Sequence, residues 1–197
     1  MNGPRLVKMT REAFDALPSK AVPRTTRLVD PTFESPRAIE FIIAAYCRKF
    51  LEDNHAIEPL LGDEQGRRSL TQGQHLLYIL TALDGEVKNG GVAQFFWNCP
   101  SFVFETSDAL KFLELTELHE LYDRALENLI GKQDTWRDLR KQWVDAGANP
   151  PWEAFQKSYE VLDVSWFDDA YFETHADVLL RSLIEYVKAH LTEFIEP

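Results

Sequence analysis

The sequence predicts an all-α protein: a single multi-helix domain of about eight helices that follows an irregular N-terminal arm. After residue 35, apolar residues recur at three- and four-residue spacing through most of the chain, which is the pattern of amphipathic helices. No segment shows the alternation of apolar and polar residues that indicates a β-strand. With 197 residues, of which 45 % are hydrophobic, the chain is long enough to bury a substantial core.

We expect residues 1–34 to form the irregular arm and residues 35–197 to form the helical domain. Five prolines punctuate the arm and its junction with the domain, which favours extended structure there. Residues 1–37 carry seven Lys or Arg against four Asp or Glu, whereas residues 38–197 carry 14 against 28. The body is therefore strongly acidic, which argues against a generic DNA-binding or membrane-binding protein.

Each predicted helix carries a start or stop signal: a capping side chain, a proline in the first turn, or a glycine after the last turn. The predicted starts are Ser35-Pro36, Thr71 with Gln74, Ser107, Thr116, Asp134, Asn149-Pro150-Pro151, and Thr174 with Asp177. A short helix is also expected over residues 94–97, after the glycine pair. The predicted stops include a helix end near Leu83 and the glycines Gly131 and Gly147.

Residues 84–98 form the least ordinary segment of the chain. Asn89-Gly90-Gly91 permits a positive φ and a sharp reversal of the backbone. Two interpretations are open: a structural corner whose aromatic residues fill the core, or a small recognition pocket that uses Glu86, Asn89 and Gln94. The glycine pair lacks the spacing of a dinucleotide-binding or phosphate-binding loop.

The same segment resembles the signature of a bacterial helical family that is named after a DNA-mimic protein and is mostly of unknown function. The residues that carry the resemblance are Glu86-Val87-Lys88-Asn89-Gly90-Gly91, Gln94-Phe95-Phe96 and Asn98. Phe167–Phe172 is similar to the family's second landmark, and the resemblance covers roughly residues 70–194. Lys88 stands where the family more often has Asn, a change that a surface position tolerates.

The resemblance implies an α-helical domain. For the namesake it also implies a binding protein whose acidic surface imitates duplex phosphates and occupies the DNA-reading face of a transcription factor. A homodimer is a further expectation, since a two-fold arrangement would match a dimeric repressor.

Two groups of acidic residues are the candidate partner-binding surface. On a helical wheel, four carboxylates share one face with only Arg124 among them: Glu117, Glu120, Asp123 and Glu127. The second group lies in a stretch from 160 to 180 without Lys or Arg and comprises Asp163, Asp168, Asp169, Glu173 and Asp177. Carboxylates on one helix face are about 5–6 Å apart, within a factor of two of the ~3.4 Å phosphate spacing on one DNA strand. Plain solvated helix faces are also acidic, so both interpretations stand open.

No motif supports catalysis, a metal or a cofactor. The five histidines are dispersed, and the segment from His119 to Asp123 lacks the second histidine of the zinc-protease pattern. Neither a secretory signal nor a membrane-spanning stretch is evident, and Cys47 and Cys99 lie in apolar contexts typical of reduced core residues. The sequence therefore predicts a cytoplasmic protein.

The predicted function is that of an acidic, non-enzymatic binding protein without a cofactor. Its expected partner is a basic DNA-binding protein such as a transcription factor, rather than nucleic acid or a membrane. The alternative is a small-ligand-binding or enzymatic helical protein with a pocket around the Glu86–Asn98 motif.

Overall fold

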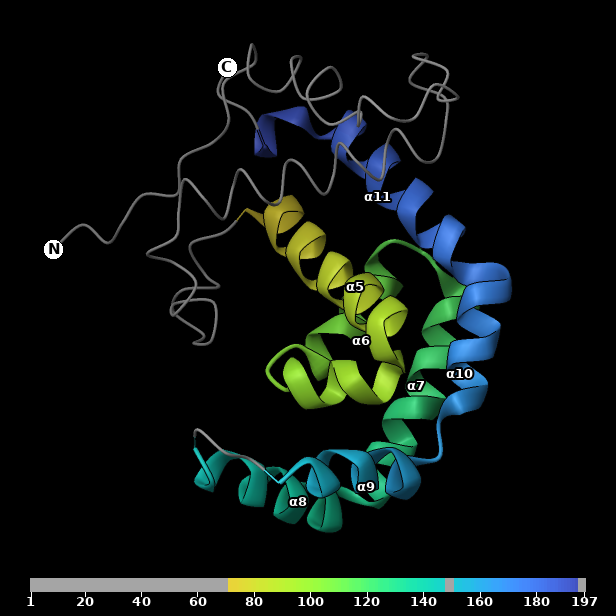
Figure 1. Cartoon of the computed structure of the whole chain (residues 1–197). Helices are drawn as coiled ribbons and strands as arrows, with labels where there is room; N and C mark the ends of the chain where they lie inside the picture. Colours follow the sequence, from red (N-terminus) through yellow and green to blue (C-terminus); the bar gives the residue numbers. More distant parts are fainter. Residues whose placement is uncertain (1–70, 148–150, 195–197) are drawn as a thin grey trace, which may run out of the picture. The chain divides into compact units, whose positions relative to one another are not determined.

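The computed structural model describes residues 71–147 and 151–194, and Figure 1 shows the helices that they form. Every regular element within these residues is a helix, which confirms the predicted all-α class. The N-terminal arm and the helix predicted from Ser35 lie outside the described residues. The described residues divide into two units, one within residues 82–176 and the other made of residues 71–81 and 177–194, and each is considered separately.

The long helix α5 (Gln72–Asn98) begins at the predicted capping box. The Thr71 backbone N–H donates to Gln74 Oε1 at 3.0 Å, and the Gln74 backbone N–H donates to Thr71 Oγ1 at 3.2 Å. These two bonds satisfy backbone donors that the first turn of a helix otherwise leaves free, and they confirm this start signal.

The predicted helix end near Leu83 is wrong, because α5 continues for two further turns. Asp84 and Lys88, one turn apart, form an ion pair of 2.8 Å on the exposed side, while Val87 is buried on the other. The break falls instead at Gly90 (φ −165°, ψ 20°) and Gly91 (φ 86°, ψ 172°), as the glycine pair predicts. The residues after this kink form the expected short helical segment.

The first four helices that follow α5 in the 82–176 unit are α6 (Val103–Phe112), α7 (Thr116–Gly131), α8 (Gln133–Asp145) and α9 (Trp152–Leu162). The predicted bounds of α7 at Thr116 and Gly131 are confirmed. Ser107 does not start a helix, because it lies in the middle of α6 and its hydroxyl bonds to a side chain of α7.

The last helical stretch has no start at Thr174. Helix α10 (Ser165–Ala170) leads into a π-helical turn, η2 (Tyr171–His175), and then directly into α11 (Ala176–Ala189). Thr174 is therefore an interior, exposed position of a continuous helical run. In the other unit a short 3₁₀ turn, η3 (Leu191–Glu193), brings Glu193 to the start of α5, where Glu193 Oε2 accepts a 2.6 Å bond from the Gly73 N–H.

An aromatic core joins the second segment of α5 to α7 and α10. Phe95, Phe96, Tyr122 and Phe167 are all fully buried, and the Tyr122 ring makes edge contacts with the other three at centroid distances of 5.9–6.4 Å. The Tyr122 hydroxyl donates to the Val103 carbonyl at 2.7 Å, which ties α7 to the start of α6. The aromatic residues of the family-like motif are thus tightly packed against α7 and α10.

Candidate functional site

The glycine kink is held by a carboxylate from a distant part of the chain. Val92 is the first residue after the kink, and its backbone N–H donates to Asp168 Oδ1 at 2.7 Å. A carboxylate at this position caps the new helical segment and interacts favourably with its dipole. A Cβ atom at Gly91 would overlap Asp168 Oδ2, so only glycine admits this approach.

Burial raises the pKa of Asp168 above its ordinary value of 3.8, and the neighbouring Asp169 acts in the same direction. The hydrogen bond from Val92 opposes this shift without reversing it. The folded protein therefore binds a proton at Asp168 more tightly than the unfolded chain does.

Replacing Asp168 by Asn should remove one contribution to the free energy of unfolding that decreases as the pH rises. The Asn side chain keeps an oxygen that accepts from Val92 but carries no charge. As the pH rises from below 3.8 through the raised pKa, the wild type should lose stability relative to Asp168→Asn. Urea denaturation of both proteins at about pH 3 and about pH 7 measures this difference, and parallel pH profiles would contradict it.

The Glu86 carboxylate links the two segments of α5 across the kink. Glu86 Oε2 accepts hydrogen bonds from Gln94 Nε2 at 2.7 Å and from Asn98 Nδ2 at 2.8 Å. A Cβ atom at Gly90 would overlap Gln94 and lie 3.0 Å from the Tyr159 hydroxyl, so the backbone approaches both side chains closely. Burial, Asp168 and Glu86 together raise the pKa of Tyr159 to about 12, which keeps it protonated at neutral pH.

The two family-like landmarks contact each other in space. Besides the Asp168–Val92 bond, the buried Tyr171 hydroxyl donates to Asp84 Oδ1 at 2.6 Å. Asn89 is the exception in the motif, since its side chain is exposed and makes no hydrogen bond within the described residues. The polar groups of the motif are thus mostly engaged inside the protein, which favours the structural interpretation over the pocket.

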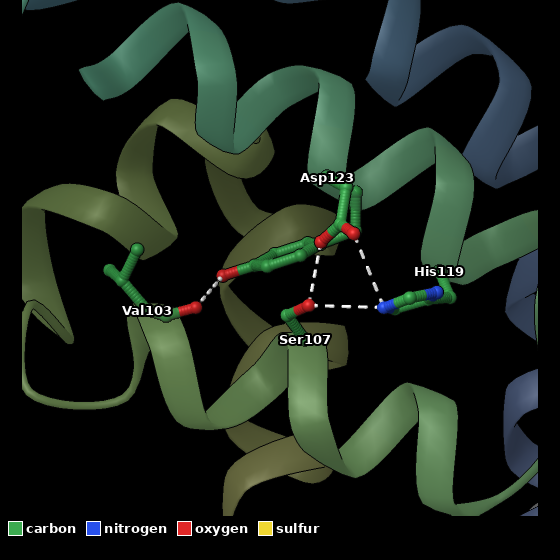
Figure 2. Close-up of polar contacts among 5 residues, drawn as sticks. Val103, Ser107, His119 and Asp123 are labelled. Carbon is green, nitrogen blue, oxygen red and sulfur yellow. Dashed lines mark hydrogen bonds and ion pairs between the residues drawn. The ribbon is translucent and has the colours of Figure 1, made fainter.

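A polar cluster that the sequence does not predict joins α6 to α7, and Figure 2 shows its contacts. Ser107 Oγ donates to Asp123 Oδ1 at 2.6 Å and lies 3.1 Å from His119 Nε2, which is itself 3.3 Å from Asp123 Oδ2. In a nucleophilic triad the histidine uses different ring nitrogens for the serine and the carboxylate. Here one nitrogen faces both, so the cluster is built as a link between helices rather than as a triad.

Three carboxylates of the first acidic group are exposed on α7: Glu117, Glu120 and Glu127. In the part of the chain that the structure describes, none of the three forms an ion pair. Asp123 differs from them because it is bound to Ser107 and His119. Arg124, the one base on this face, places its guanidinium 4.5 Å from the centre of the Trp166 ring on α10, in a cation–π contact.

Four residues of the second acidic group belong to the same 82–176 unit as the first group, and in this unit α7 and α10 lie side by side (Figure 1). Asp163, Asp169 and Glu173 are exposed, whereas Asp168 points to the kink. Asp177 is exposed on α11 and belongs to the other unit. Between residues 82 and 176 the sequence has 18 acidic residues against eight Lys and Arg, so this unit carries most of the negative charge.

Two further findings concern metals and membranes. Among residues 71–147 and 151–194, no three His, Cys, Asp or Glu side chains are arranged to hold a metal ion. None of the described helices is both long and apolar enough to cross a membrane.

Cys99 is a half-buried thiol, and burial together with Glu86 raises its pKa to about 11, which disfavours the reactive thiolate.

Comparison with known proteins gives one match. A family model described as DMP19-like protein matches residues 68–190, which is more than half of the chain. No curated protein and no solved structure matches. The matched residues include the glycine kink, both acidic groups and the contacts of Asp168 and Tyr171, and they confirm the resemblance seen in the sequence. The chain therefore belongs to the DMP19-like protein family.

Proposed function

We propose that this protein is a DNA mimic that binds a basic nucleic-acid-binding protein, such as a transcription factor, at its DNA-binding face. The observation that carries the proposal is the exposed side of α7, where three carboxylates form no ion pair among the described residues. Membership of a family named after a DNA-mimic protein supports it. The protein acts by occupying a surface and needs no chemistry of its own.

The geometry of α7 suits this role because a helix holds its side chains at fixed intervals. Glu127 follows Glu117 by ten residues, so the three carboxylates extend over about 15 Å of helix axis. That length matches about four phosphate steps along one DNA strand. The contact between Arg124 and Trp166 draws the only base on this face toward α10, so the row presents negative charge to a cationic partner.

The alternative ligand pocket around the Glu86–Asn98 motif is less well supported. A ligand that bound the Glu86 carboxylate would have to replace the amide donors of Gln94 and Asn98, which already lie 2.7 and 2.8 Å away. Losing those bonds would also release the second segment of α5 from the first.

Competition between DNA and this protein tests the proposal. The purified protein is used to capture partners from a native extract at low salt, and each captured protein is then purified with its own DNA site. We expect the complex to weaken by about tenfold or more between low and physiological salt, because its attraction is electrostatic. DNA and the acidic protein should exclude each other from the partner. A ternary complex, or an affinity that does not change with salt, would contradict the proposal.

A further inference from the structure

A small surface hollow lies where α6 begins, α7 ends and α8 begins. Its volume is about 150 Å³, and apolar side chains form most of its wall: Val103, Phe104, Leu129 and Ile130. An engineered cavity of about 150 Å³ with a similar apolar lining holds a benzene ring. The hollow is therefore the right size for one leucine or phenylalanine side chain.

Two large apolar side chains in the wall of the hollow are exposed to solvent. Phe104 is 63 % exposed and Ile130 is 45 % exposed, although both are large hydrophobic residues. Exposed apolar side chains around a concavity are typical of surfaces that a partner covers. Arg137 also lines the hollow, and its Nη1 atom lies 3.8 Å from Asp134 Oδ1. This ion pair compensates the positive charge beside the hollow.

The hollow lies at the C-terminal end of α7, beyond the exposed carboxylates Glu117, Glu120 and Glu127 of that helix. Ile130 follows Glu127 by three residues and Asp123 by seven, which places the three side chains on the same side of the helix. On α6, Phe104 precedes the exposed Asp108 by one turn. A partner that lies along the carboxylates of α7 would therefore reach the hollow at the end of the helix.

We propose that this hollow receives one apolar side chain from the DNA-contacting element of the basic partner. The proposal rests on the proposed function and adds a determinant of specificity to it. DNA-binding proteins place apolar side chains among basic ones, where they contact thymine methyl groups or wedge between bases. When such an element docks on α7, the carboxylates orient it and the hollow buries its apolar side chain, which adds affinity that charge alone does not supply.

Two synthetic peptides test the hollow directly: a short lysine peptide with one central phenylalanine, and the same peptide with alanine in its place. Titration calorimetry at low salt should show that the wild type binds the phenylalanine peptide about tenfold more tightly. The variant Phe104→Ser should lose this preference. The matched control Phe112→Ser, at a second exposed phenylalanine of α6 that does not line the hollow, should keep it.

Equal binding of both peptides by the wild type would overturn the inference. The indole N–H resonance of Trp136, which lines the hollow, gives a second measurement on the wild type, and it should shift with the phenylalanine peptide only. The proposed function is tested separately, because reversing the charges of Glu117, Glu120 and Glu127 should weaken both peptides without changing their ratio. If the wild-type preference for phenylalanine is found but charge reversal has no effect, the mimic proposal fails, and the assignment of the occupant to a DNA-contacting element fails with it. The hollow then remains a binding site for an apolar side chain only.

Discussion

Reversing three carboxylates of α7 together, by Glu117→Lys, Glu120→Lys and Glu127→Lys, should lower the affinity for the basic partner by about 100-fold or more at low salt. Each change replaces an attraction with a repulsion, and like charges brought together at an interface cost several kcal/mol. A loss of about 2.7 kcal/mol already corresponds to 100-fold. All three side chains are exposed and unpaired among the described residues, so the fold should not change. Calorimetric titration against the identified partner measures the affinity.

The matched control reverses three acidic residues of α8 and α9, by Asp138→Lys, Asp145→Lys and Glu153→Lys. These side chains are also exposed, and the change in net charge is identical, but here basic residues lie among the acidic ones. We expect the control to weaken binding by less than about fivefold, because only distant, screened charges change. Equal losses in both variants would mean that the partner senses total charge, and α7 would then not be the mimic surface.

Asp123 is left out of the reversal because it has a structural role that the helical wheel does not reveal. The wheel places Asp123 with the other three carboxylates, and on that basis it belongs to the acidic surface. Its bonds to Ser107 and His119 depend on how α6 packs against α7, and Ser107 is 16 residues away in the chain. The same packing explains why Ser107 fails as a helix start: its hydroxyl binds a carboxylate instead of a backbone N–H.

The local parts of the fold follow from the sequence because their interactions are local. The capping box of Thr71, the bounds of α7 and the break at Gly90-Gly91 depend on residues within one turn of each other. Thr174 misleads for the opposite reason: a threonine before an acidic residue is typical of a helix start, but here the preceding residues are already helical.

The long-range parts of the candidate site cannot be predicted from one sequence. Both landmarks of the family are recognisable in it, but nothing in the sequence indicates that they touch. Asp168 binds the N–H of Val92, 76 residues earlier, and Tyr171 binds Asp84, 87 residues earlier. Asp168 therefore has the appearance of a surface carboxylate in the sequence and the role of a helix cap in the structure.

Gly91→Ala should reduce the free energy of unfolding by about 3–5 kcal/mol, a large fraction of the 5–15 kcal/mol of a typical domain. Its φ of 86° with ψ of 172° belongs to a region that is essentially restricted to glycine, where another residue costs about 1–3 kcal/mol. The added methyl group would also displace Asp168 from the Val92 N–H, and a hydrogen bond to a charged group contributes about 1.5–3 kcal/mol. Urea denaturation followed by circular dichroism measures the loss.

Gly85→Ala is the control for this prediction, since Gly85 lies in the first segment of α5 and a Cβ atom there would meet nothing within 4 Å. Alanine is the better helix former, so the control should be as stable as the wild type or about 0.5–1 kcal/mol more stable. A Gly91→Ala variant as stable as the control would contradict both causes, the unfavourable φ and the overlap with Asp168. Repeating Gly91→Ala in an Asp168→Ala background removes the overlap but keeps the unfavourable φ, so the difference between the two backgrounds isolates the contribution of the carboxylate.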